Sequence, residues 1–293
     1  MKLWATLGAR WRAWHWTLPA AILLVLVVGA LAAPWIAPQN PYALASLRLE
    51  DSTMAPAWTA AGRLTATPWR YFLGTDAQGR DILSAVLYGL RVSLLVGVVA
   101  TALAALFGVA LGLAAGYWRG WTDSVIMRIA DIQLAFPTVL IALFLMAIWG
   151  QGLWKIIFAV AIVHWVIYAR TVRGAALAER EKDYIAAIRA LGAGPIRIVL
   201  RHLLPNLMTP VLVISAVEFA SVVMLEATLS FLGLGVPITR PSLGMLIKFG
   251  YDEVFSGAWW IWLFPGLALV ALVLSLNWLA DSLRDRFSPP EGG

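Results

Sequence analysis

Two glutamates, Glu218 and Glu226, lie within a long apolar stretch of the sequence, where ionisable side chains are unusual. Their spacing places them on broadly the same side of a helix. Because a charge inside a membrane is costly, such residues usually face a cavity, a partner or a transport path. The two glutamates could line a path for a solute with a charged amine. The alternative is a buried hydrogen bond to a neighbouring helix, or a headgroup-level position for Glu226.

The sequence lacks the residue patterns of several enzyme classes. It has no cysteine, which excludes disulfides, thiolate metal sites and cysteine nucleophiles. Its histidines, His15, His164 and His202, are too far apart in sequence to form a local metal cluster. No GxxxxGK loop followed by Ser or Thr is present, so the chain cannot cradle ATP phosphates by that route. HExxH and GxSxG motifs are absent too, which argues against an intramembrane enzyme.

The composition predicts an all-α polytopic membrane protein. Of the 293 residues, 61% are hydrophobic and only 13% are charged, too few to cover a soluble particle. A spanning helix needs about 20 mostly apolar residues. Runs of this kind predict six transmembrane helices, at 17–38, 92–117, about 132–150, about 153–171, about 206–234 and 258–280.

The distribution of basic residues predicts the orientation of these helices. Most of the 22 lysine and arginine residues fall in segments that share one side of the membrane, so both termini are expected in the cytoplasm. Spread between apolar runs, they indicate topology control rather than nucleic-acid binding. The first run ends in GALAA, like a secretory signal peptide, but Pro34 would follow the cut. We therefore expect a retained anchor helix.

Small residues recur along the second predicted span. Gly108, Gly112 and Gly116 follow one another at intervals of one helical turn, with Ala104 one turn earlier. Such a ridge lets helix backbones approach closely in lipid, where packing replaces the hydrophobic driving force. The ridge predicts a tightly packed bundle.

A more elaborate stretch, DYIAAIRALGAGPIRIVLRHLLPN, covers residues 183–206 between two apolar runs. Asp183 suits the N-terminus of a helix, in which Ile185, Ile188 and Leu191 would form an apolar stripe. Gly192 can end this helix in a left-handed conformation. Proline is well suited to a first helical position, so a second helix is expected to begin after Gly194.

This second helix is predicted to run from Pro195 to Leu204 and to end at Pro205. Its apolar residues, Ile196, Val199, Leu200 and Leu203, would share one side, opposite Arg197 and Arg201. The periodicity alone fits a hairpin that docks in a protein cleft as well as an amphipathic helix on anionic headgroups. The small residues favour docking because they permit close approach: Ala186, Ala187, Ala190, Gly192 and Ala193.

The stretch resembles the EAA loop of ABC-importer permeases, a Glu-Ala-Ala pattern followed by Gly and, later, Leu-Pro. Here Ala186, Ala187 and Ile188 precede Gly192, and Leu204-Pro205 follows. The whole chain resembles the dipeptide/oligopeptide/nickel branch of this family, in the permease with a long first external loop. The matching stretches are LGTDAQGRDILSAVLYGLRVSLLVG (73–97), YWRGWTDSVIMRIADIQLAFP (117–137), LSFLGLG (229–235) and WWIWLFPGLALVALVLSLNWLADSLRDRFSP (259–289).

The resemblance implies a division of labour. The chain would have the type I ABC-importer permease fold and form half of a translocation pathway for short peptides or a related small solute. Its implied partners are a second homologous permease subunit, two cytoplasmic ATPases and an external solute-binding protein, in the lipid of a bacterial inner membrane. The chain itself would be non-catalytic and carry no cofactor, since ATP and Mg²⁺ would bind the ATPases.

The chain departs from the family's pattern at two positions of the loop. Ala186 stands where the motif has glutamate, and Ile188 stands where it has alanine. An ionic contact made by that glutamate cannot be carried over, so Asp183 or Arg189 would have to serve. The residues expected to couple the chain to an ATPase are Asp183, Ala186, Ala187, Ile188, Arg189, Leu191, Gly192, Ala193, Pro195, Leu204 and Pro205.

Three regions are expected along the chain. Residues 1–38 would form a cytoplasmic tail and the first spanning helix, and residues 39–90 an external loop. Residues 91–293 would form a five-helix core that contains the cytoplasmic coupling loop, 179–205. In the external loop, the alternating charges of Asp76, Arg80 and Asp81 predict a local salt-bridged cap.

A second class of protein fits the intramembrane carboxylates. An ion-coupled secondary transporter would use Glu218 and Glu226 as its coupling pair. Such transporters contain inverted repeats, and no convincing repeat relates the halves of this sequence.

Overall fold

The structure is a computed structural model that describes residues 2–43, 47–63 and 71–287. Its helices are α1 (Lys2–Ile36), α2 (Ala60–Arg63), α3 (Ile82–Trp118), α4 (Gly120–Leu134), α5 (Thr138–Trp149), α6 (Leu153–Arg180), α7 (Asp183–Ala190), α8 (Pro195–Ile198), α9 (Leu204–Phe231), α10 (Leu243–Asp252) and α11 (Trp260–Phe287). Short 3-10 turns lie at Leu49–Asp51 and Val254–Ser256, and a π-helical turn at Val199–Leu203. The all-α prediction is confirmed.

Among the described residues, five helical stretches are long and apolar enough to cross a membrane: Thr17–Ile36, Ile82–Trp118, Leu153–Arg180, Pro195–Phe231 and Trp260–Arg286. The span predicted at 92–117 begins earlier, at Ile82, so the last residues of the stretch 39–90 are helical. The span predicted at 153–171 continues to Arg180. The predicted bounds were too short because charged residues near these helix ends lower the hydropathy. Hydropathy identifies only the part of a helix that lies in lipid.

The third predicted span, about 132–150, is wrong as a single straight helix. The chain bends by 90° between α4 and α5, so this pair is a broken span or a re-entrant loop. Pro137 precedes α5 in an extended conformation, with ψ 130°. The residue before a proline disfavours helical geometry, and proline has no N–H to continue the hydrogen-bond ladder. The described residues therefore contain five spans, or six if the bent pair α4–α5 is counted as one.

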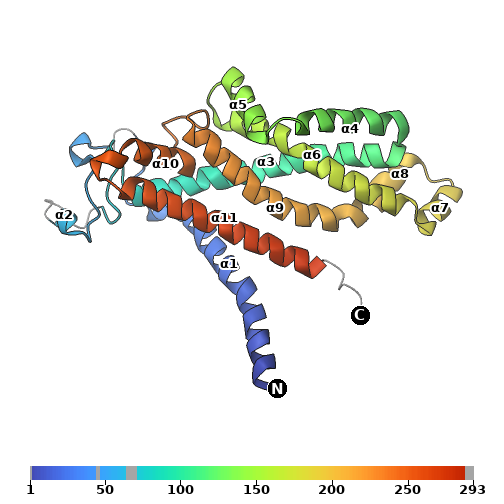
Figure 1. Cartoon of the computed structure of the whole chain (residues 1–293), viewed down its shortest axis with the longest axis horizontal. Helices are drawn as coiled ribbons and strands as arrows, with labels where there is room; N and C mark the ends of the chain where they lie inside the picture. The colour runs from blue at the N-terminus through green and yellow to red at the C-terminus, as the bar shows by residue number, and fades with distance from the viewer. Residues whose placement is uncertain (1, 44–46, 64–70, 288–293) are drawn as a thin grey trace.

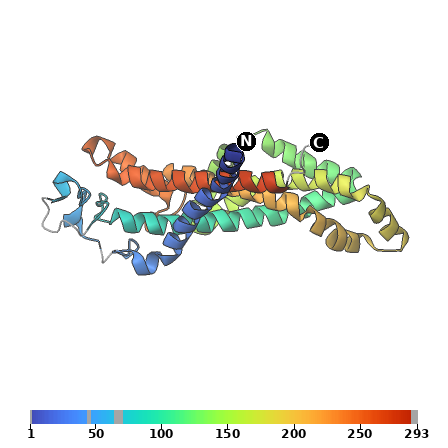
Figure 2. The ribbon, with the colours of Figure 1, turned by 90° about the horizontal axis from the view of Figure 1, so that it is seen from below.

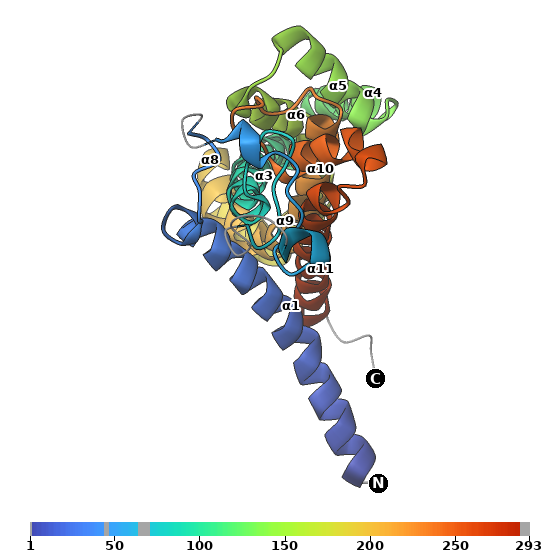
Figure 3. The same cartoon turned by 90° about the vertical axis from the view of Figure 1, so that its left-hand side faces the viewer.

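The centre of the bundle is formed by α3, α6 and α9, which lie side by side along the long axis of the molecule (Figure 1). Helix α11 packs against α9 and α10, and α1 packs against α11 and α3. Figures 2 and 3 show that α1 crosses the bundle obliquely and that its N-terminal half projects away from it. The α7–α8 hairpin lies at one end of the bundle, and α2 and α10 lie at the other.

The small-residue ridge of α3 packs directly on α6. A Cβ atom added at Gly108 would lie 2.4 Å from the carbonyl oxygen of Trp165, and one at Gly112 would lie 2.5 Å from that of Ala169. Real Cβ atoms do not approach so closely, so only glycine permits this helix separation. The pair α3–α6 is the most extensive helix contact of the chain. The predicted close packing is confirmed.

Candidate functional site

The hairpin at the end of the bundle begins at the C-terminus of α6. Helix α7 starts at Asp183 and ends at Ala190, and Gly192 follows with φ +83°. Backbone N–H groups of Gly192 and Ala193 donate to the carbonyl oxygens of Arg189 and Ile188. This pair of bonds is a Schellman motif, which satisfies the last carbonyls of a helix and needs a left-handed residue. The predicted cap at Gly192 and the restart at Pro195 are both confirmed.

The predicted end at Pro205 is wrong. The chain passes from α8 through the π-helical turn Val199–Leu203 into α9 without leaving helical geometry. The N–H of Leu204 donates to the carbonyl oxygen of Val199, one residue further back than in an α-helix. This wider turn lets the helix pass the position where Pro205 donates no hydrogen bond. The hairpin is therefore continuous with a spanning helix rather than joined to it by a loop.

The inner face of the hairpin packs on the ends of the long helices. Ile185, Ile198, Val199 and Leu203 are buried in one apolar cluster with residues of α3, α6 and α9. The predicted stripes are therefore only half right. Leu191 is 87% exposed because α7 ends before it and the chain leaves the helical path.

The second stripe differs because the π-helical turn changes the direction of the side chains. Ile196 is 64% exposed and Leu200 is 58% exposed, while Ile198 is buried in their place. Together with Leu191, these two residues present apolar side chains outward at the hairpin. Exposed large apolar residues gathered on a protruding element are typical of an interaction surface.

The other predicted coupling residues lie around this surface. Ile188, Ala193 and Leu204 are half-buried, and the remaining ones are exposed: Asp183, Ala186, Ala187, Arg189, Gly192, Pro195 and Pro205. Asp183 and Arg189, the charged residues expected to replace a motif glutamate, both point to solvent. The hairpin thus brings the predicted residues together on one protruding element.

A carboxylate that the sequence analysis did not single out holds the base of the hairpin. Glu179, in the last turn of α6, accepts hydrogen bonds from Tyr184 Oη at 2.6 Å and from Asn206 Nδ2 at 3.2 Å. Its other oxygen lies 2.6 Å from Lys182 Nζ. Burial, and next the bond to Glu179, raise the pKa of the Tyr184 hydroxyl. Several charged residues lie near the end of α6, and no pattern in the sequence distinguishes Glu179 from the others.

The intramembrane glutamates are both buried and paired. Glu226 is fully buried and accepts hydrogen bonds from Ser93 Oγ at 2.9 Å and Ser230 Oγ at 2.7 Å. Glu218 Oε2 lies 2.6 Å from Nδ1 of His164 on α6. In this conformation both carboxylates follow the second of the two interpretations, a hydrogen bond to a neighbouring helix.

Helix α4 is held to α6 by polar contacts. Asp123 accepts from Arg173 Nη2 at 2.7 Å, and Asp131 pairs with Arg170. Gln133 Nε2 donates to the carbonyl oxygen of Val163 at 2.8 Å. These bonds fix the first half of the bent pair beside a straight helix.

At the opposite end of the bundle, the charged cap expected in the external loop is present. Asp76 Oδ2 accepts from Arg80 Nε at 2.8 Å, and its Oδ1 accepts from backbone N–H groups of Gln78 and Arg80. Asp81 caps α3 through the N–H and hydroxyl of Ser84. Burial raises the pKa of the Asp81 carboxyl.

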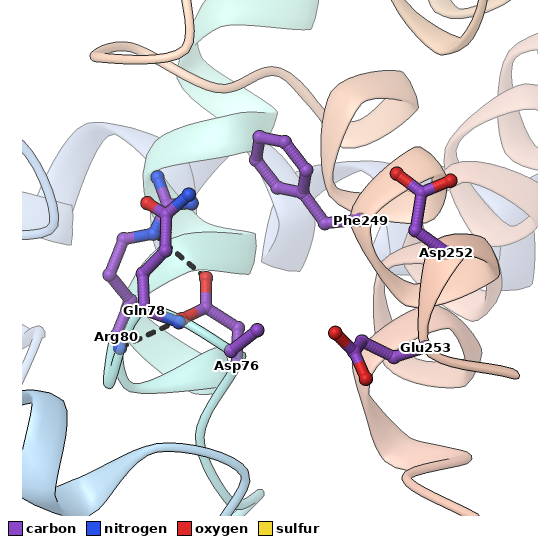
Figure 4. Close-up of a pocket in the computed structure, with 7 residues that line it drawn as sticks. Asp76, Gln78, Arg80, Phe249, Asp252 and Glu253 are labelled. Carbon is purple, nitrogen blue, oxygen red and sulfur yellow. Dashed lines mark hydrogen bonds and ion pairs between the residues drawn. The ribbon is translucent and has the colours of Figure 1, made fainter. Parts of the chain in front are cut away.

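A shallow pocket lies beside this cap. Figure 4 shows Asp252 and Glu253, at the end of α10, on the side opposite Asp76 and Arg80, with Phe249 between them. The Arg80 guanidinium lies 5.1 Å from the centre of the Phe249 ring. In the described part of the chain, no three His, Asp or Glu side chains gather as metal ligands would.

The long apolar helices are those of a multi-pass membrane protein. The family that the sequence matches makes it a permease, the non-catalytic membrane component of a transport system, and permeases of this family carry no cofactor. The chain belongs to the family described as binding-protein-dependent transport system inner membrane component, which matches residues 108–289. The predicted membership of the ABC-importer permeases is confirmed, as is the inner membrane as its location.

Two curated relatives match nearly the whole chain. A di/tripeptide transport system permease protein DppC of Pseudomonas aeruginosa is 38% identical over 268 residues, covering 91% of this chain and 85% of the relative. A dipeptide transport system permease protein DppC of Haemophilus influenzae is 35% identical, covering 92% of this chain and 88% of the relative.

A solved structure shares the fold. The inward-facing MetNI methionine ABC transporter has a chain that matches with a TM-score of 0.57 at 19% identity, covering 70% of this chain and 97% of that one. At this identity the match shows the fold alone, which is the importer-permease fold predicted from the sequence.

Proposed function

We propose that this chain forms half of the translocation pathway of an ATP-driven importer of short peptides. A second, homologous permease subunit would supply the other half, and an external binding protein would deliver the cargo. Support for the cargo comes from the relatives, which are described as di/tripeptide and dipeptide permeases and align over most of the chain. Peptides are therefore the first solutes to test.

We further propose that residues 179–205 receive the motion of a cytoplasmic ATPase, with both termini of the chain on the same side. The observation that carries this proposal is the two-sided hairpin. Leu191, Ile196 and Leu200 are exposed, while the opposite face is packed against α3, α6 and α9. An outward apolar surface can enter a cleft of a partner, and an inward core can carry the displacement to the bundle.

The mechanism follows from the continuity of hairpin and span. ATP binding would close a pair of ATPases, each holding the hairpin of one permease. Because α8, the π-helical turn and α9 form one helical path, movement of the hairpin tilts a spanning helix directly. Helix α9 contacts α3, α6 and α11, so the bundle would switch as packed bodies between inward-open and outward-open states. The close Gly–backbone packing of α3 on α6 keeps these two helices together during the switch.

The rival function is ion-coupled transport through Glu218 and Glu226. Both carboxylates are buried and hydrogen-bonded in this conformation, Glu226 to serines and Glu218 to His164. A matching helical permease family and a protruding hairpin favour ATP coupling. The two functions differ in their energy source, so an ATPase variant that cannot use ATP distinguishes between them.

The first experiment uses the complex of this chain with its partner permease, ATPases and binding protein. Uptake of a labelled dipeptide is measured in vesicles with wild-type ATPase and with an ATPase whose phosphate-binding lysine is replaced. We expect uptake to disappear with the mutant ATPase. Unchanged uptake would show that another energy source drives transport.

The second experiment tests the hairpin. Leu191→Arg places a charge on the exposed apolar surface, and Gly192→Asp places a side chain where φ is +83°, which only glycine adopts freely. Both variants should insert in the membrane and lose ATP-driven uptake. The matched control is Ala178→Arg, which adds the same charge at an exposed position of α6 outside that surface. Normal uptake in both hairpin variants would refute the coupling role.

A further inference from the structure

Glu179 connects three elements at the base of the hairpin. It belongs to the last turn of α6, and its side chain is 12% exposed. Its Oε1 accepts a hydrogen bond of 2.6 Å from Tyr184 on α7 and one of 3.2 Å from Asn206 on α9. Asn206 Nδ2 also donates to Tyr184 Oη at 2.8 Å. We call these three residues the hairpin clamp.

The clamp gives the hairpin a defined orientation, which its apolar core does not provide. Ile185, Ile198 and Leu203 hold the hairpin on the bundle, but apolar contacts have no preferred direction and tolerate sliding. Hydrogen bonds to a carboxylate are stronger than those between neutral groups and require a defined geometry. The clamp therefore fixes the angle between the hairpin and the helices on each side of it.

The clamp also lies where a force applied to the hairpin would pass into α6 and α9. A push on the exposed tip, near Leu191, acts on α7 first. From α7 the Tyr184 hydroxyl reaches α6 through Glu179 and α9 through Asn206. Without this link, α7 is joined to α9 only through residues 191–194 and α8, and by its apolar face, so a push on α7 would reach α9 less directly.

We propose that Glu179 is a positioning residue for energy coupling, whose carboxylate, through Tyr184 and Asn206, makes the hairpin, α6 and α9 move as one body. The inference rests on the coupling role proposed above. It assigns to Glu179 a function inside the permease, distinct from contact with the ATPase. Lys182, which pairs with the same carboxylate from an exposed position, takes no part in the clamp because it joins no further element.

The test measures coupling rather than activity alone. Wild type, Glu179→Ala, Glu179→Gln, Tyr184→Phe and the double variant Glu179→Ala/Tyr184→Phe are assembled with their partner subunits in vesicles. ATP hydrolysis and dipeptide uptake are recorded in the same sample, and Lys182→Gln is the matched control. Tyr184→Phe removes one oxygen atom and keeps the ring, so it preserves the apolar contacts of α7.

We expect uptake per ATP hydrolysed to fall about tenfold in Tyr184→Phe, the change that losing one charge-assisted hydrogen bond makes in an equilibrium. Glu179→Ala should lose at least as much, because the bond from Asn206 is lost as well. Each single variant removes the Tyr184–Glu179 bond together with one bond of Asn206. The double variant loses all three bonds, but the shared one only once, so its loss should be smaller than the sum of the two single losses. Glu179→Gln keeps an acceptor and should recover most of the coupling, and Lys182→Gln should resemble wild type.

Two results would overturn the inference. One is an unchanged ratio of uptake to hydrolysis in Tyr184→Phe. The other is a parallel loss of both activities, which means weaker assembly rather than lost coupling. Wild-type uptake reports on the proposed function separately. If that uptake is absent, hydrogen exchange of the α7 amides in the purified chain decides, because equal exchange in wild type and Tyr184→Phe would show that no clamp exists.

Discussion

Replacing Gly108 by alanine should separate the two most closely packed helices of the bundle. The new Cβ atom would lie 2.4 Å from the carbonyl oxygen of Trp165 and 2.5 Å from Cβ of Tyr168. Ordinary contacts begin at 3.4 Å, so α3 and α6 must move apart by about 1 Å, and a gap of this size forfeits roughly a quarter to a half of each dispersion contact beside it. Neither neighbour can yield, because one is backbone and the other begins a fully buried side chain.

The cost follows from this displacement. Overpacking a close-packed interior typically costs about 1–3 kcal/mol. Because Gly112 holds its own backbone contact one turn further along, the helices cannot separate at Gly108 alone, and we expect the upper part of this range. The control is Gly174→Ala on α6, where an added Cβ meets nothing within 4 Å. Alanine is the better helix former there by about 1 kcal/mol, so this control should be slightly stabilised.

The assay is equilibrium unfolding of the purified chain in mixed micelles, followed by the loss of helical circular dichroism as denaturing detergent is added. We expect Gly108→Ala to unfold at lower detergent than wild type and Gly174→Ala at equal or higher detergent. The gain in helix propensity is common to both variants and cancels, so their difference should be about 2–3 kcal/mol, the cost of overpacking. Equal stability of the two variants would show that the close approach of α3 and α6 is not rigid.

Substitutions at two further positions test one end and the interior of the bundle. Asp81→Ala removes the cap of α3 and should cost about 1 kcal/mol, whereas Asp81→Asn keeps an acceptor and should cost less. Because burial raises the pKa of the Asp81 carboxyl, its ionised form is disfavoured in the folded state, so wild type should lose stability as pH rises through that pKa, and thermal unfolding of Asp81→Asn should lack this dependence. Glu218→Ala leaves His164 buried without its partner and should destabilise the chain by about 1–3 kcal/mol, while Glu218→Gln should retain ATP-driven uptake. Loss of uptake in a stably inserted Glu218→Gln variant would instead favour a role in the transport path.

Hydropathy and spacing were enough to predict the class of the protein, most of its spans and its packing ridge. Lipid imposes a fixed length of apolar sequence, and close helix contact requires small residues at helical intervals, so both leave a local pattern. The Schellman cap at Gly192 was predicted for the same reason, because a left-handed residue after an amphipathic helix is a local requirement. The family was recognised from motifs such as GTDAQGRD and LSFLGLG.

Other features depended on contacts between distant segments. The π-helical turn that lets α9 include Pro205, and the burial of Ile198 in place of Ile196 and Leu200, follow from how the hairpin packs on α3, α6 and α9, and apolar spacing does not show them. Likewise, Glu179, Tyr184 and Asn206 meet only because α6, α7 and α9 converge at one end of the bundle. Hydrophobic periodicity is a local property that fixes where helices form, whereas the partner of a buried carboxylate is chosen by tertiary packing.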